Sequence, residues 1–427
     1  MENHSSQLLL SCLQNALSAY HAVDFAKELL QENEFVQLYE TDDFELTIGG
    51  KYFIERSGCL LAFTVGNLDK FTFKIAASHL DSPALKLKAN PLKYGENCVS
   101  LNVETYGGGI WYSFFDRPLR IAGRIVCKQE GKIVTKTVTS PFIVTIPSVA
   151  VHQNRNVNDG FTVNPQIDLL PLLSLRGGEE KWLDEMVGGD NVLSYDLFVV
   201  NADMPYTFGV NNEFLASPRL DNLTSVCASL EALLAKADSE GICMAALFNH
   251  EEIGSSTTQG AGGDFMENVL RRIGYAFHFD DNEFYKALAS SFLLSVDNAH
   301  ALHPNHPEKS DVTNKTLLGG GIVIKSHANG SYVTDGIAAA VIKTIFDNAG
   351  VSHQEFFNRS DVRSGSTLGK IALTRMGVLG ADIGLAQLAM HSATESFVLS
   401  DYTEMVNGLT AFFSSEIERE ANDWRVR

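Results

Sequence analysis

Basic residues, long apolar runs and paired cysteines are all scarce in this sequence. The 427-residue chain has 33 Lys and Arg against 52 Asp and Glu, which gives a formal charge of −19, and no basic cluster interrupts this excess. Nucleic acid and anionic membranes are therefore not expected as partners. The first residues lack a basic start, and their longest apolar run is only Leu8 to Leu10. We expect a cytoplasmic protein without a membrane span.

The cysteines are too scattered for a disulfide framework. Six are present, none in a C-x-x-C pair: Cys12, Cys59, Cys98, Cys127, Cys227 and Cys243. Neither a set of disulfides nor a thiolate zinc site is predicted. We expect most of them to be small residues of the core.

Three zones differ in their hydrophobic pattern. Residues 1–91 combine an amphipathic helical segment with strand-like runs, residues 92–212 are β-rich with frequent turn signals, and residues 213–427 alternate helices and strands again. In the last zone a helix over 223–237 and strands over Ile242–Phe248 and Phe292–Val296 are predicted. The return of the first pattern indicates one α/β domain that carries an inserted β-rich domain.

Two adjacent glutamates, Glu251 and Glu252, follow the strand predicted to end at Phe248, in "FNHEEIGSSTTQGA". A helical H-E-x-x-H zinc motif is excluded because Gly254 stands where its second histidine would be. A G-x-S-x-G nucleophile elbow is excluded at "SGSTLG", where Ser364 stands two residues before Ser366. Neighbouring side chains on an extended segment point in different directions. One glutamate can therefore bind a metal while the other transfers a proton; the alternative is a pair of solvated surface acids.

Further polar groups lie where predicted strands give way to loops. "ASHLDSP" places His79 and Asp81 on one face of an extended segment, where the carboxylate can orient a ligating imidazole. Asp221 precedes a helix, and its alternative role is an N-cap. Two more apolar runs are followed by polar residues, namely Asp297, His300 and His303 in one case and His391 in the other. Open α/β sheets place their sites at this edge.

Two imidazoles and three carboxylates suit a pair of zinc ions. If one aspartate bridges, each ion receives one histidine, one terminal carboxylate, the bridge and a shared water. The three carboxylates and a hydroxide offset the +4 charge of the ions. The remaining glutamate is then free to act as the general base.

Seven motifs in order give the chain a strong resemblance to the aspartyl aminopeptidase family of co-catalytic zinc metallopeptidases. They are SHLDSP, YGGGIWYSFFDRPL, VHQNRNVNDGF, PRLDN, NHEEIGS, SVDNAHALHPN and MHSATE. The resemblance implies that His79, Asp221 and Asp297 hold one ion and that Asp221, Glu252 and His391 hold the other. It makes Glu251 the general base and Asp81 the partner of His79.

The same resemblance implies a phosphorylase/hydrolase-like three-layer α/β catalytic domain, an inserted dimerisation domain, and dimers that assemble into a dodecamer. His152 of the insert is expected to reach the active site of a partner subunit. Lys325 and Tyr332, in a segment similar to the family's IKxNxNQRYAT, are expected to line a pocket for an acidic side chain. His300 is expected to supply a second donor there.

The expected activity is release of N-terminal residues, preferably Asp or Glu, from peptides with a free N-terminus. A metal-bridging water would attack the scissile carbonyl while Glu251 moves the proton. Zinc is the expected metal, although the same ligands accept cobalt or manganese. Alternatives are an aminopeptidase of apolar specificity, a related carboxypeptidase or deacylase, and a catalytically silent oligomeric scaffold.

The sequence departs from the family pattern at four positions. Thr394 stands where arginine is usual, Arg363 and Ser364 replace Pro-Cys, and Lys370 replaces proline. None is a proposed ligand. We expect these changes to affect the substrate pocket and the subunit contacts around it.

Overall fold

The chain, described by a computed structural model over residues 2–188, 191–235 and 239–427, is built around a nine-stranded mixed sheet. Its central strands are mostly apolar and are buried along their whole length, as expected for strands covered by helices on each side: β3 (Cys59–Val65), β4 (Phe73–His79), β13 (Ile242–Phe248) and β14 (Phe292–Val296). Both strands predicted in the third zone have the observed bounds.

The order of the sheet is β1-β2-β3-β13-β4-β14-β18-β16-β17. Strands β13, β4, β14 and β18 run parallel to one another, so their carboxyl ends meet at one edge. The outer strands are β1 (Val36–Leu38), β2 (Lys51–Arg56), β16 (Ile322–Lys325), β17 (His353–Phe356) and β18 (Leu379–Gly384).

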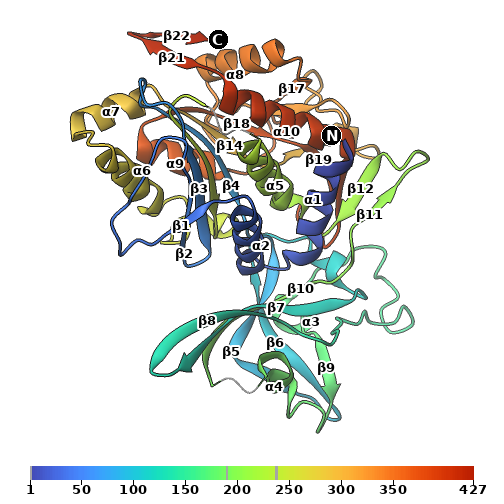
Figure 1. Cartoon of the computed structure of the whole chain (residues 1–427). Helices are drawn as coiled ribbons and strands as arrows, with labels where there is room; N and C mark the ends of the chain where they lie inside the picture. Colours follow the sequence, from blue (N-terminus) through green and yellow to red (C-terminus); the bar gives the residue numbers. More distant parts are fainter. Residues whose placement is uncertain (1, 189–190, 236–238) are drawn as a thin grey trace.

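Helices cover both faces of this sheet and form two separate cores (Figure 1). One layer contains α1 (Glu2–Asn15), α2 (Ala19–Glu32), α5 (Leu220–Leu234), α8 (Gly336–Ala349) and α10 (Leu399–Ser414). The opposite layer contains α6 (Phe265–Ala276), α7 (Asp281–Ala289) and α9 (Leu368–Met376). The predicted three-layer α/β fold is therefore confirmed. The predicted end of α5, at residue 237, lies outside the described residues.

A second, six-stranded antiparallel sheet lies below the α/β body in Figure 1 and has its own hydrophobic core. Its order is β8-β7-β10-β5-β6-β9. The strands are β5 (Ala84–Tyr94), β6 (Cys98–Tyr106), β7 (Leu119–Gln129), β8 (Lys132–Thr139), β9 (Leu172–Leu175) and β10 (Val192–Asn201). The short helices η1 (Trp111–Phe114), α3 (Pro165–Asp168) and α4 (Trp182–Val187) belong to the same segment. The sheet thus uses residues between Ala84 and Asn201, while the predicted insert covers 92–212.

A third sheet, ordered β11-β12-β20-β19-β15, brings together segments that are distant in the sequence. Its strands are β11 (Tyr206–Phe208), β12 (Phe214–Ser217), β15 (Ala299–His300), β19 (Ala386–Leu388) and β20 (Glu395–Val398). The single turns η2 (Glu251–Ile253) and η3 (Pro307–Lys309) and the hairpin β21 (Ile417–Glu420) and β22 (Asp423–Val426) complete the elements.

All six cysteines lie in described residues and form no disulfide there, and five of them are buried, as predicted; Cys98 is partly exposed. Within the described ranges, no helix is both long and apolar enough to span a bilayer.

Candidate metal centre

Three neighbouring parallel strands deliver most of the acidic and imidazole side chains to one edge of the main sheet. His79 is the last residue of β4, Asp297 follows β14, and Glu251 and Glu252 form the turn η2 after β13. Because β13, β4 and β14 are adjacent and parallel, their carboxyl ends meet. This is the edge at which open α/β sheets place their sites.

Asp221 lies between two histidines at the start of α5. Its Oδ1 is 3.4 Å from Nε2 of His79, and its Oδ2 is 3.4 Å from Nε2 of His391, which lies in the turn between β19 and β20. Asp297 Oδ1 is 3.5 Å from the same His79 nitrogen, and Glu252 Oε1 is 3.3 Å from the His391 nitrogen. One carboxylate is thus shared by two groups of ligands.

These separations fit a metal ion in each group. A tetrahedral zinc site with bonds of 2.0–2.1 Å has neighbouring ligand atoms about 3.3 Å apart. The donor atoms of the His79, Asp221 and Asp297 group all lie within 4.8 Å of one another, as do those of the Asp221, Glu252 and His391 group. Both groups carry the nitrogen and oxygen donors that zinc accepts.

Two buried carboxylate oxygens support the same interpretation. Asp221 Oδ1 and Glu252 Oε1 make no hydrogen bond to any described residue. An acceptor buried without a partner costs about 1–3 kcal/mol or more when it is charged. A cation placed between these oxygens and the histidines would satisfy both, so the residues fit a bound metal.

The electrostatics of the site are dominated by burial and by carboxylates. Burial raises the pKa of Glu252 well above its ordinary value. Burial lowers the pKa of His79, but its contacts with Asp221, Asp297 and Asp81 raise it by more, so that the net pKa is well above normal. The excess of acids over imidazoles is a charge imbalance that divalent cations would correct.

Glu251, the other acid of the turn, forms a third group with His79 and Glu252, whose donor atoms also lie within 4.8 Å of one another. Burial is the largest cause that raises its pKa, to about 7, and the charges of Asp297, Asp81 and Asp221 act in the same direction. Its neighbour Glu252 faces His391. The sequence analysis places the two acids on an extended segment, whereas they lie in the single turn η2.

Asp81 contacts both His79 and the turn η2. His79 Nδ1 hydrogen-bonds the backbone carbonyl of Asp81 at 3.0 Å and lies 3.6 Å from its carboxylate. The carboxylate also accepts the backbone N–H groups of Glu251 and Glu252, each at 3.1 Å, and the hydroxyl of Tyr106 at 2.7 Å. Asp81 thus fixes the turn that carries both glutamates.

The glycine triplet of "YGGGIWY" lies against the site. Gly107 has a φ of 73°, and a Cβ there would lie 3.1 Å from Cβ of Glu252. The Gly108 carbonyl is 2.8 Å from Nδ1 of His391 and orients that ring. The positive φ and the close approach explain why glycine is required at position 107.

Lys325 is buried beside the site, with only 1% of its surface exposed. Its Nζ donates to the carbonyls of Asp297 at 2.8 Å and Asn298 at 3.2 Å, and lies 3.8 Å from Asp297 Oδ2. The ring of Tyr332 is 5.1 Å from the ammonium. Burial acts to lower the pKa of Lys325, but the charge of Asp297 raises it above its ordinary value, so the ammonium stays charged.

The other predicted substrate residues are exposed. His300 ends β15 on the surface and packs edge to face with Phe356, the ring centroids 6.4 Å apart. His152 lies on the exposed loop between β8 and α3 of the six-stranded unit. His152 belongs to none of the metal-capable groups of side chains in the described part of the chain.

The departures from the family pattern fall outside the ligand set. Thr394 Oγ1 accepts from Arg117 at 3.1 Å and from Asn201 at 3.2 Å, where the third sheet meets the inserted segment. Ser364 Oγ donates to the carbonyl of Gly365 at 2.5 Å. Arg363 and Lys370 are exposed.

Comparison with known sequences identifies one family. A profile described as Aminopeptidase I zinc metalloprotease (M18) matches residues 12–413. The chain is 38% identical to a probable M18 family aminopeptidase 2 of Clostridium acetobutylicum, over 95% of this chain and 98% of that relative. It is 33% identical to a probable aspartyl aminopeptidase of Ricinus communis, over 95% and 94% of the two chains.

Solved structures agree in fold. A chain of the Ape4 and Nbr1 complex, solved by cryo-EM, is 29% identical to this protein, and the two superpose with a TM-score of 0.92. The match covers 96% of this protein and 86% of the chain in the complex. The S. cerevisiae mApe1 dodecamer is 26% identical, with a TM-score of 0.83 and 96% of both chains covered.

Proposed function

The chain belongs to the M18 family of zinc metallo-aminopeptidases, as its resemblance to the aspartyl aminopeptidases predicts, and we propose that it releases N-terminal Asp and Glu at a centre of two divalent ions. The activity class follows from the family. The number of ions, their ligands and the preferred residue are the proposal. The observation that carries it is the position of the Asp221 carboxylate, with each oxygen 3.4 Å from a different histidine.

In this proposal His79, Asp221 and Asp297 hold one ion, and Asp221, Glu252 and His391 hold the other. When bound, a pair of zinc ions supplies polarisation of the scissile carbonyl and lowers the pKa of a water. Glu251 takes the proton of the attacking water at its carboxylate and returns it to the leaving amine. Asp81 keeps Glu251 and Glu252 in place through their backbone N–H groups.

Preference for an acidic N-terminal residue rests on Lys325. Its two short hydrogen bonds go to backbone carbonyls, and the nearest carboxylate oxygen, at 3.8 Å, is beyond hydrogen-bonding distance. An ammonium has three donors. One remains to meet a substrate carboxylate, and a local cation is what an acidic substrate needs against a chain charge of −19. Tyr332 and the exposed His300 complete the proposed pocket.

A homo-oligomer is also part of the proposal, because the S. cerevisiae relative of similar fold is a dodecamer. The loop that carries His152 has exposed apolar side chains beside it, with Val149 and Val151 60% and 52% accessible. Exposed apolar side chains next to a histidine suit a surface that a second subunit covers. His152 would then donate to the oxyanion of the partner's tetrahedral intermediate. A cytoplasmic location fits six cysteines that form no disulfide in the described part of the chain, since disulfides are rare in reducing compartments.

A panel of aminoacyl-aminomethylcoumarin substrates, run with and without chelator and then with zinc, cobalt or manganese added back, tests this function. We expect Asp and Glu derivatives to be cleaved fastest, loss of activity with chelator, and recovery with metal. Faster cleavage of the Leu derivative would exclude the acidic preference. Cleavage of N-terminally blocked peptides would indicate a carboxypeptidase or deacylase, and inactivity with every metal a silent scaffold.

A further inference from the structure

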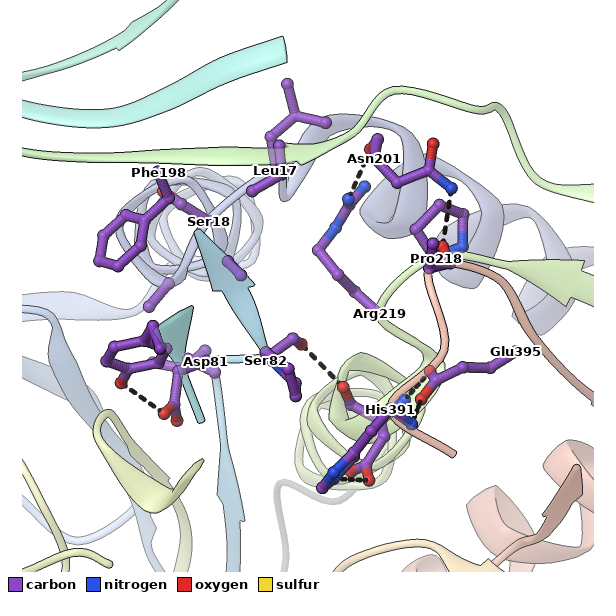
Figure 2. Close-up of a pocket in the computed structure, with 18 of the residues that line it drawn as sticks. Leu17, Ser18, Asp81, Ser82, Phe198, Asn201, Pro218, Arg219, His391 and Glu395 are labelled. Atoms are coloured by element: carbon purple, nitrogen blue, oxygen red, sulfur yellow. Dashed lines mark hydrogen bonds and ion pairs between the residues drawn. The ribbon is translucent and has the colours of Figure 1, made fainter. Parts of the chain in front are cut away.

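Glu395, the first residue of β20, joins two of the proposed metal ligands through their backbones. The residue is 2% exposed. Its Oε2 accepts the N–H of Asp221 at 2.9 Å, and its Oε1 accepts the N–H of His391 at 2.6 Å. Figure 2 shows the Glu395 carboxylate pointing toward His391. One side chain therefore holds the start of α5 against the turn between β19 and β20.

The backbone of His391 requires such support. Its φ is 67°, in the left-handed region, where a residue with a side chain is disfavoured by roughly 1–2 kcal/mol. Besides Glu395, the carbonyl of Gly108 contacts its ring and the N–H of Ile110 donates to its carbonyl at 2.9 Å. The position of the imidazole is thus set by hydrogen bonds from outside its own turn.

Glu395 also connects to a third segment of the site. Gln387 Nε2 donates to Glu395 Oε1 at 3.3 Å, and Gln387 Oε1 accepts from Asn298 at 2.7 Å. Asn298 follows Asp297 and donates to the carbonyl of Leu220, which precedes Asp221, at 3.1 Å. The buried chain Glu395, Gln387 and Asn298 therefore ties together the segments that carry Asp221, Asp297 and His391.

We propose that Glu395 is a positioning residue of the metal centre that fixes the backbones of Asp221 and His391 at the spacing required for the ion they share with Glu252. This inference rests on the proposed function. Every partner of Glu395 named above is an N–H donor, so both of its oxygens must accept. An amide of the same shape offers only one oxygen and would turn its NH₂ toward an N–H group.

The test compares Glu395→Gln with a matched control, Asp401→Asn. Asp401 is 1% exposed and likewise accepts two backbone N–H groups, those of Gly319 at 2.8 Å and Gly321 at 2.9 Å, but contacts none of the proposed ligands. Co²⁺ titration of the metal-free proteins, followed by visible absorption and by elemental analysis after dialysis, gives the number of ions and their Kd values.

For Glu395→Gln we expect one of two ions to bind about 10- to 100-fold more weakly, the usual effect of losing a group that orients ligands. The Co²⁺ that remains should have the spectrum of Glu252→Ala, which lacks a proposed ligand of the same ion. Excess metal should restore occupancy. Asp401→Asn should bind both ions as the wild type does.

Wild-type Kd values for both ions in Glu395→Gln would overturn the positioning role and leave the proposed two-metal site intact. Equal weakening in Glu395→Gln and Asp401→Asn would overturn it as well, because the effect would then be general destabilisation. A wild-type protein that binds no metal would overturn the proposed site, and the inference with it.

Discussion

The backbone N–H of Glu251 donates to Oδ1 of Asp81 at 3.1 Å, while the other oxygen of the same carboxylate accepts the N–H of Glu252 at 3.1 Å. Two adjacent acids are thereby held on one rigid turn. Their side chains then have different neighbours, since Glu252 contacts His391 at 3.3 Å. The assignment of a proton-transfer role to one and a ligand role to the other depends on this arrangement.

The first prediction separates these two glutamates. Glu251→Ala should keep both ions but lower kcat by at least the ~10²–10⁴ usual for a general base. Glu252→Ala should lose one ion, because it removes a proposed ligand. Elemental analysis of both variants alongside their kcat values checks this. Equal metal loss in the two variants would contradict the assignment.

The second prediction concerns Lys325. Removal of its charge by Lys325→Met should lower kcat/KM for Asp- and Glu-terminated substrates at least tenfold and leave Ala-terminated ones nearly unchanged. An unpaired substrate carboxylate costs about 2–5 kcal/mol. Lys74→Met is the matched control, since Lys74 is also buried and also donates to two backbone carbonyls, those of Phe413 and Ser415.

A loss of activity toward all substrates in Lys325→Met would indicate a different role for this lysine. Its ammonium bonds the carbonyl of Asp297 at 2.8 Å. If Lys325→Met slows every substrate alike and lowers metal content, the lysine supports Asp297 and the acidic pocket lies elsewhere.

The third prediction tests His152 across subunits. Neither His152→Ala nor Glu251→Ala homo-oligomers should be fully active. If His152 serves the partner's site, a hybrid dimer contains one site with both residues intact, so mixing the two variants should restore some activity. Subunit exchange is verified with differently tagged chains by mass spectrometry. Hybrids that form without regaining activity would rule out the cross-subunit role.

The fourth prediction is a pH dependence of stability at the junction of the two units. His21 of α2 lies 2.8 Å from Ser18 Oγ and 3.0 Å from Thr139 Oγ1 of β8. Burial lowers its pKa from 6.5 to about 4; the charge of Asp24 opposes this shift and the charge of Arg219 adds to it. Because the folded-state pKa is depressed, the unfolded chain binds the extra proton. Stability from this residue is present above pH 6.5 and lost as the pH falls toward 4.

The loss should reach about 1–2 kcal/mol at pH 5. His21→Gln cannot titrate, so the wild-type Tm should fall more than the variant Tm between pH 7 and pH 5. Differential scanning calorimetry of both proteins measures this difference. The contributions of the other titratable groups are the same in both proteins and therefore cancel. Parallel Tm curves would show that His21 is not the titrating group.

Local sequence signals were sufficient for the strands and for the types of residue at their ends. Predominantly apolar runs predict Ile242–Phe248 and Phe292–Val296 with the observed bounds. The change from helical to alternating periodicity indicates the inserted sheet, and polar residues at strand ends indicate the edge where the site lies. These features depend on neighbours within a few residues, which the sequence displays directly.

Contacts between residues that are distant in the sequence are determined only by the tertiary structure. The carboxylate of Asp81 lies 3.6 Å from the His79 ring and also accepts the N–H groups of Glu251 and Glu252, because the ends of β4 and β13 are adjacent in the sheet. The burial of Lys325 and the two contacts of Glu395 likewise depend on how strands and turns pack. Hydrophobic periodicity specifies which face of a helix or strand is buried. The polar atoms that meet at the end of that element depend on how whole elements are placed relative to one another. This placement is fixed only when the chain has folded.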